Sequence, residues 1–81
     1  MTIDDVRNII NEEKLVGYNF FEDRNNDENE IVIMNDSAEW VVYATDERAS
    51  KVTGSEKKFD SEEEALKNFV KRLRALNILK K

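Results

Sequence analysis

Apolar residues recur at intervals of three and four near both ends of the chain, the spacing of a helix that buries one side. The first stripe consists of Ile3, Val6, Ile9 and Ile10. Thr2 stands before it in the position of an N-cap, and Asp5 follows three residues later, which is a short form of the capping box. The pattern predicts a helix over residues 3–14, with Gly17 as its end signal.

A second helix is predicted near the C-terminus. Its apolar stripe comprises Ala65, Leu66, Phe69, Val70, Leu73 and Leu76. Ser61 and the three glutamates that follow it form a capping box, and acidic side chains are favourable at the positive end of a helix. This helix is predicted over residues 62–78 and is the clearest element in the sequence.

Between the helices, short apolar and aromatic runs alternate with polar turn sequences. Aromatic and β-branched residues favour strands, whereas Asn and Asp mark the turns in a chain with no Pro and two Gly. The predicted strands cover residues 16–22, 31–34 and 39–45, with a short edge strand at 55–59. Residues 23–29 suit a turn or hairpin loop, and short connections of this kind favour an antiparallel meander. Lys57 and Lys58 would protect its last edge.

The order of these elements predicts a single α+β domain over residues 1–81. An antiparallel three- or four-stranded sheet, in the order α-β-β-β-(β)-α, packs against N- and C-terminal helices. The chain is 40% hydrophobic and 38% charged, with a net charge of −5. This composition supports one small core and excludes wholesale disorder.

The predicted strands are apolar on both faces. In the third strand Trp40 and Val42 point one way, while Val41 and Tyr43 point the other way. If both helices lie on one face, an apolar patch remains on the other, and such a patch marks a surface for a partner or a second copy. Alternatively, the helices lie on opposite faces, or the loop at 46–54 covers the patch.

The composition removes most catalytic chemistry. The chain has no Cys and no His, so disulfides, thiolate nucleophiles and the commonest general base are missing. Gly17 and Gly54 are isolated and form no phosphate-binding loop. We therefore expect no enzyme and no cofactor.

The segment 23–29 places oxygen ligands at alternating positions, as in the first half of a calcium loop. Glu28, however, stands where that loop needs Gly for its sharp turn. Met34 stands where the bidentate Glu is required. We therefore expect no metal at this segment, which suits a solvated loop better.

Negative charge is concentrated in the middle of the chain. From Glu22 to Glu39 there are seven acids and a single base, Arg24. Such a surface repels nucleic acid and attracts a basic partner, although it also serves solubility. The one basic stripe, which suits a solvated helix face better than a nucleic-acid site, comprises Lys67, Lys71, Arg72, Arg74, Lys80 and Lys81.

The chain has no apolar run long enough to span a bilayer, and it opens with acidic residues rather than with a secretory leader. We therefore expect a cytoplasmic location and no membrane partner. Three consecutive charges, Asp46, Glu47 and Arg48, follow the third predicted strand. They indicate either a loop anchored by an ion pair of Arg48 or a partner contact presented by a rigid sheet.

A longer pattern runs through the C-terminal half of the chain. It begins with Trp40-Val41-Val42-Tyr43-Ala44-Thr45-Asp46-Glu47-Arg48-Ala49 and continues with Phe59, Glu63-Glu64-Ala65-Leu66, Phe69, Arg72, Leu73 and Arg74. This pattern resembles the immunity protein 59 family. The most specific part is a Trp followed by a β-run that ends in Thr-Asp-Glu-Arg. The similar stretch covers residues 38–76. These are small proteins of bacterial polymorphic-toxin systems, so the resemblance implies an α+β fold and neutralisation of a cognate toxin by direct binding.

Sequence and resemblance together predict a non-enzymatic inhibitor that docks on a toxin. The candidate partner-binding residues are Glu22, Asp23, Asp27, Glu28, Trp40, Tyr43, Asp46, Glu47 and Arg48. A second hypothesis is a structural or regulatory homodimer that uses the apolar sheet face. A third is a nucleic-acid binder that uses the basic side of the C-terminal helix.

Overall fold

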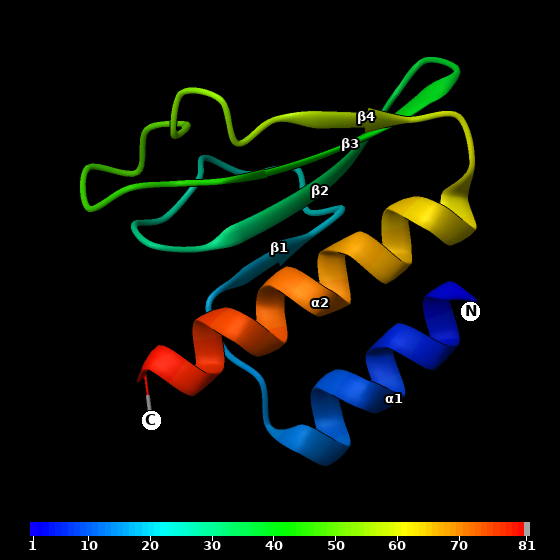
Figure 1. Ribbon diagram of the computed structural model, residues 1–81, viewed down its shortest axis with the longest axis horizontal. Helices are drawn as coiled ribbons and strands as arrows, with labels where there is room; N and C mark the ends of the chain where they lie inside the picture. Colours follow the sequence, from blue (N-terminus) through cyan, green and yellow to red (C-terminus); the bar gives the residue numbers. More distant parts are fainter. Residues whose placement is uncertain (81) are drawn as a thin grey trace.

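The computed structural model describes residues 1–80 and arranges them as a four-stranded sheet with one helix before it and one after it (Figure 1). The elements are α1 (Ile3–Glu13), β1 (Tyr18–Phe20), β2 (Ile31–Asp36), β3 (Glu39–Ala44), β4 (Lys57–Phe59) and α2 (Glu62–Lys80). The α+β class and the order of the elements are confirmed. β4 is the short edge strand that the sequence predicted.

Helix α1 begins as expected and ends earlier than its glycine indicated. The Asp5 N–H donates to Thr2 Oγ1 at 3.2 Å and the Thr2 N–H donates to Asp5 Oδ2 at 2.8 Å, which completes the capping box. The helix ends at Lys14, which adopts the left-handed conformation (φ 53°). Gly17 (φ 79°) lies beyond the end and turns the chain into β1. The predicted range of 3–14 therefore holds to within one residue, and the left-handed residue at the end of the helix is Lys14 rather than Gly17.

The sheet is mixed, which corrects the expected antiparallel meander. The strand order is β1-β2-β3-β4, and β3 is antiparallel to both of its neighbours. β1, however, runs parallel to β2, with Tyr18 opposite Ile31. Phe21 has a left-handed backbone (φ 58°) and turns the chain out of the sheet directly after β1. Residues 21–30 then return to the start of β2, so they form a crossover and not a hairpin.

Both helices lie on the same side of the sheet (Figure 1). α2 packs on β2, β3 and β4, and α1 packs beside α2. Their apolar sides and one face of the sheet share a single buried cluster, which comprises Val6, Leu15, Phe20, Ile31, Ile33, Val42, Ala65, Leu66, Phe69, Val70 and Leu73. The stripes predicted from the sequence therefore face the core.

Polar contacts join the C-terminal ends of the two helices. Arg74 on α2 makes a two-pronged ion pair with Glu13 on α1, at 3.0 and 2.6 Å. The buried amide of Asn77 donates to Val16 O and accepts from the Val16 N–H, both at 2.9 Å. These bonds fix the segment that leads from α1 into β1, and so they fix the position of that strand.

The second face of the sheet is covered by the crossover rather than left as a broad apolar patch. Val32 on this face is fully buried and Val41 is 6% exposed. Asn26 of the crossover accepts from Asn19 Nδ2 at 3.4 Å and donates to Tyr43 Oη at 2.8 Å. Asn19 and Tyr43 flank Val32 in register, so Asn26 spans the valine. The loop at 46–54, one of the alternatives for this cover, places Lys51 against the Tyr43 ring.

Candidate functional site

Residues 21–30, here called the acidic loop, are organised around Arg24. Its guanidinium donates to both carboxylate oxygens of Glu30, at 3.2 and 3.1 Å. The carboxylate of Glu22 lies 3.5 Å from Arg24 Nε, and that of Asp27 lies 3.5 Å from Nη1, which also donates to Glu30. The hydrogen bond with Glu30 raises the pKa of Arg24 above its ordinary value, so this centre stays positive. One base therefore holds three of the five acids of the loop in fixed positions.

Glu30 ties the acidic loop to the sheet. Its side chain is 3% exposed and accepts the Asp27 N–H at 2.9 Å in addition to its bonds with Arg24. The hydroxyl of buried Thr45, which follows β3, accepts the Glu30 N–H at 2.9 Å and donates to Asp27 O at 2.8 Å. Each of these hydrogen bonds involves Glu30 or Thr45, which are both buried. The sheet therefore holds the acidic loop in position.

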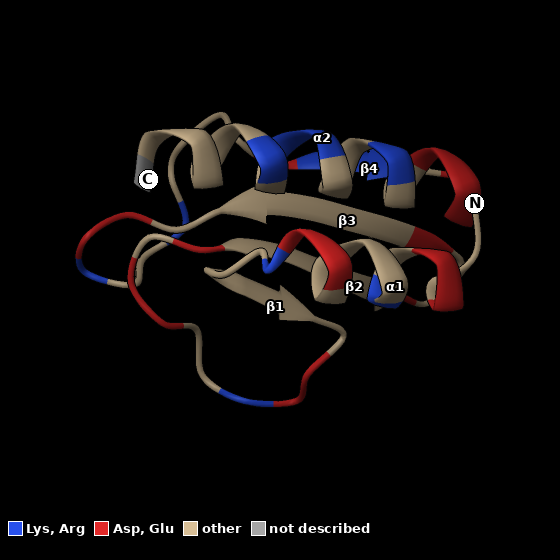
Figure 2. Cartoon of the chain, turned by 90° about the horizontal axis from the view of Figure 1, so that it is seen from below, with Lys and Arg blue, Asp and Glu red and all other residues tan. Residues whose placement is uncertain are grey.

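The turn at 46–50, which follows Thr45, lies against the acidic loop. Asn29 N–H donates to Asp46 O at 2.9 Å. The carboxylate of Asp46 accepts two backbone N–H groups of its own turn, from Arg48 at 2.8 Å and Ser50 at 3.0 Å. Ala49 adopts a left-handed backbone (φ 63°) to close the turn. The two acidic segments therefore lie side by side at one end of the sheet (Figure 2).

The anchor of this turn is not the expected ion pair. The guanidinium of Arg48 is in none of the ion pairs formed within residues 1–80, and its side chain is exposed. A carboxylate that accepts backbone N–H groups stabilises a turn without any base, which is why Asp46 alone suffices. Arg48 and Glu47 are left pointing into solvent.

Most of the candidate residues come together at this end of the molecule. The acidic loop carries Glu22, Asp23, Asp27 and Glu28, all exposed, and the turn carries Asp46, Glu47 and Arg48. Tyr43 joins them through its hydrogen bond with Asn26. Nothing in the sequence pointed to Glu30 and Thr45 as the residues that organise this end, although Arg24 stands out there as the only base among seven acids.

Trp40 does not belong to this group. It lies on the helix-facing side of β3, half-buried against the core. The side-chain amide of Asn35 is oriented with its oxygen toward the indole of Trp40. In this orientation Trp40 Nε1 donates to the Asn35 oxygen at 3.2 Å. Trp40 and Tyr43 were expected on opposite faces, and the register places Trp40 on the same side as Phe59 and the core, which leaves Tyr43 on the other face.

Lys51 is a neighbour of Tyr43 that the sequence analysis missed. Its ammonium lies 4.7 Å from the centre of the Tyr43 ring and 2.8 Å from a carboxylate oxygen of Glu56. The hydrogen bond between the two side chains lowers the pKa of Glu56 and raises the pKa of Lys51. The pair covers one side of the Tyr43 ring, so the ring edge and hydroxyl face the acidic loop.

The basic stripe of α2 is largely engaged within the chain. Lys67 pairs with Glu63 at 3.5 Å, and Arg74 pairs with Glu13. Arg72 donates to Ser55 O at 2.7 Å, and burial lowers its pKa. Lys81 lies outside the described residues. These contacts suit a helix face that stabilises the fold, as the sequence indicated.

Within the calcium-like segment, the carboxylate of Asp27 pairs with Arg24 at 3.5 Å. Among the described residues, no group of three or more acids is arranged to hold a metal ion. No helix within residues 1–80 is long and apolar enough to cross a membrane. The exposed charged groups at this end of the molecule are the carboxylates of Glu22, Asp23, Asp27, Glu28 and Glu47 and the guanidinium of Arg48.

Comparison with known proteins gives one match. The family model described as immunity protein 59 matches residues 2–81, which is nearly the whole chain and extends the resemblance from the C-terminal half to the acidic loop. No curated protein and no solved structure matches the chain. The match covers well over half of the sequence, and so the chain belongs to the immunity protein 59 family.

Proposed function

We propose that this protein neutralises a cognate toxin in the cytoplasm by binding it, without any catalytic step of its own. Membership of the immunity protein 59 family over residues 2–81 is the observation that carries the proposal, because it suggests a toxin-neutralising role. Immunity proteins are typically non-enzymatic. The absence of Cys and His in the sequence agrees with that.

The surface that we assign to the toxin is formed by the acidic loop and the 46–50 turn. Its charged contacts are Glu22, Asp23, Asp27, Glu28, Asp46, Glu47 and Arg48, with Tyr43 at the border. Carboxylates gathered at one end of a small protein steer a basic partner and increase its rate of association. A toxin that acts on nucleic acid has such a basic surface, because it must bind phosphates.

Preorganisation supports the same assignment. The bonds of Arg24, Glu30, Thr45 and Asp46 hold both segments in place before any partner arrives. Binding then loses little conformational entropy in these loops, which favours tight association. In the complex the carboxylates occupy the basic surface of the toxin, and its substrate is excluded by charge and by volume.

Co-expression with the toxin domain encoded next to this gene tests the proposal. Bacteria that produce the toxin alone should die, and production of this protein in the same cells should restore growth. The purified proteins should form a complex of defined stoichiometry on size exclusion. If the cells die in both cases and the proteins do not bind each other, the proposal is wrong.

A further inference from the structure

The outer edge of β1 is an unpaired edge of the sheet. β1 has a neighbouring strand on one side only. Gly17 O and the Phe21 N–H bond to β2, at 2.9 and 3.1 Å, so the main-chain groups of Tyr18 and Phe20 point to the outside. Within the described residues only Arg24 reaches this edge, where it donates to Tyr18 O at 3.1 Å. That carbonyl oxygen accepts a second hydrogen bond readily, so the edge remains usable.

The two edges of the sheet differ in protection. β4 carries two exposed lysines, Lys57 and Lys58, and charged side chains on an edge discourage strand pairing. β1 is the sequence Tyr-Asn-Phe and has no charge. Of the two edges, only β1 lacks charged residues of its own, and the charged side chain that contacts it, Arg24, comes from the acidic loop.

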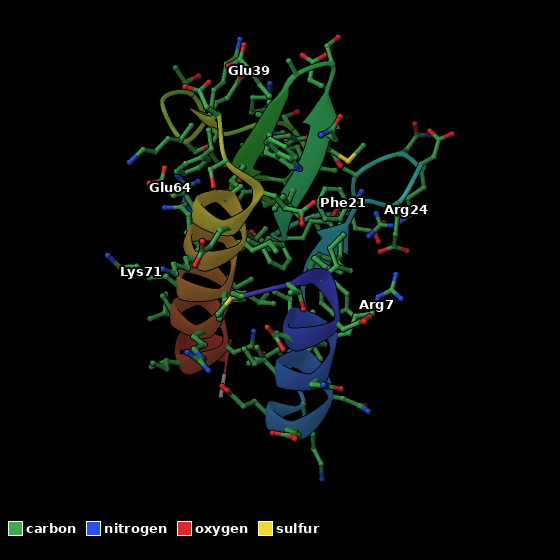
Figure 3. All side chains as sticks on the ribbon, turned by 90° about the vertical axis from the view of Figure 1, so that its right-hand side faces the viewer. Arg7, Phe21, Arg24, Glu39, Glu64 and Lys71 are labelled. Atoms are coloured by element: carbon green, nitrogen blue, oxygen red, sulfur yellow. The ribbon has the colours of Figure 1, made fainter. Side chains whose placement is uncertain are left out.

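A hollow lies along the β1 edge. Its volume is ≈ 420 Å³, and it is lined by Arg7, Ile10, Asn11, Tyr18, Phe20 and Glu22. The guanidinium of Arg7 lies 5.9 Å from the centre of the Phe20 ring. Figure 3 shows Arg7 on α1 and Arg24 on the acidic loop on the same side of the molecule, with Phe21 next to Arg24. A strand at the β1 edge would direct alternate side chains toward this hollow.

We propose that the β1 edge binds an extended segment of the toxin as a fifth strand of the sheet, with one of its side chains in the hollow between α1 and β1. This inference rests on the proposed function and names the kind of segment that it recognises. Main-chain hydrogen bonds supply affinity in such strand addition, and pockets for alternate side chains supply specificity.

Charge identifies the occupant as a basic segment rather than a second copy of this chain. The acidic loop begins directly after β1 and carries five acids and one base. Two copies paired edge to edge at β1 would bring their acidic loops together, and the like charges would repel each other. A segment with Lys or Arg beside its apolar residue would instead be attracted by the acidic loop, whose first acid, Glu22, lines the hollow opposite in charge to Arg7.

Amide hydrogen exchange of the complex with the adjacent toxin domain tests the main-chain pairing. In the free protein the Tyr18 and Phe20 amides should exchange faster than the Phe21 amide, which is bonded to β2. In the complex both should slow by about tenfold or more, as new hydrogen bonds protect them. Unchanged exchange of both amides in a complex that has formed would overturn the inference. The inference would also be overturned if both amides were protected from exchange in the protein alone and its mass in solution were that of a dimer. In that case the segment at the β1 edge would belong to a second copy of the chain.

A pair of matched variants tests the hollow. Asn11→Trp places a large ring at the hollow from an exposed position of α1, so folding is preserved. It should weaken toxin binding by about tenfold, a typical cost of blocking a contact at an interface centre. Asn8→Trp makes the same change at an exposed position on the same helix that does not line the hollow, and it should leave binding within about twofold.

The two proposals fail in different ways. If the wild-type protein neither binds the toxin nor restores growth, the proposed function is wrong. If the wild type binds and Asn11→Trp binds equally well, only the strand-addition inference is wrong. Equal weakening by Asn8→Trp and Asn11→Trp would also contradict it, because the effect would then belong to α1 and not to the hollow.

Discussion

Arg24 donates one hydrogen bond to each carboxylate oxygen of Glu30, at 3.2 and 3.1 Å, and Glu30 is the most deeply buried acid of the acidic loop. A carboxylate that is 3% exposed needs such a partner, because a buried charge without one is costly. The pair also explains the path of the chain. It closes the crossover that allows β1 to run parallel to β2, so one ion pair supports both the topology and the acidic surface.

Arg24→Ala should therefore destabilise the protein. The change leaves the Glu30 carboxylate buried and unpaired, and we expect a loss of about 2–3 kcal/mol in the free energy of unfolding. Arg24 is itself partly exposed, which places the loss at the lower end of the range for such pairs. Urea denaturation followed by circular dichroism measures it.

Arg48→Ala is the matched control for this variant. It removes the same side chain from an exposed position in the neighbouring turn, and the change in unfolding free energy should stay within about 0.5 kcal/mol. Equal destabilisation by the two variants would contradict a specific role for the pair of Arg24 and Glu30.

Thr45→Val removes the hydroxyl that joins the acidic loop to the end of β3 while it keeps the shape of the side chain. The Glu30 N–H and Asp27 O lose their partner, and we expect a cost of about 2 kcal/mol. Thr45→Ser keeps the hydroxyl and should cost less. The amide of Glu30 should exchange faster with solvent in Thr45→Val alone. Normal protection of that amide in the valine variant would show that the hydroxyl does not hold the loop.

The sequence predicted the helices well, and the reason is local. The apolar stripes of α1 and α2 have helical spacing, and the capping box of Thr2 and Asp5 fixes where the first begins. The alternation of Trp40 to Tyr43 correctly predicted a strand with two apolar faces. These signals lie within one turn or one strand, so they can be read along the chain.

The direction of β1 and the grouping of the site required long-range contacts. A polar stretch after a short strand reads as a hairpin loop, and only the left-handed Phe21 and the bonds of Arg24 make it a crossover. Trp40 and Tyr43 lie on opposite faces of the sheet because side chains alternate along a strand. Which of the two faces the helices cover depends on the packing of the whole domain. The acids at 22–28 and 46–47 meet because Thr45 binds a loop that starts over twenty residues earlier.

Lys51 should control the titration of Glu56. The pKa of Glu56 is lowered mainly by its hydrogen bond with Lys51, so the carboxyl should titrate below the ordinary range of glutamate. Because the folded-state pKa is the lower one, the pair stabilises the fold above the unfolded-state pKa, and this stabilisation is lost as the pH falls through the folded-state value. Lys51→Gln should raise the midpoint of Glu56 in a carboxyl NMR titration. Lys14→Gln, a change at an exposed lysine directly after α1, should leave the midpoint where it is, and a shift of equal size would contradict the assignment.

Glu28→Lys should slow association with the toxin. Glu28 is exposed on the acidic loop and takes part in none of the ion pairs within residues 1–80, so its reversal changes the surface charge without breaking the Arg24 network. Asp36→Lys makes the same change in net charge at the opposite end of β2, beside the β2–β3 connection.

Stopped-flow association at low salt should give a rate constant about threefold to tenfold lower for Glu28→Lys and nearly unchanged for Asp36→Lys. The difference should shrink as salt is added, because exposed charges are screened over about 8–10 Å at physiological ionic strength. Equal slowing by both variants would mean that net charge, and not the acidic loop, directs the encounter, and the assignment of the toxin surface to this end of the sheet would then be wrong.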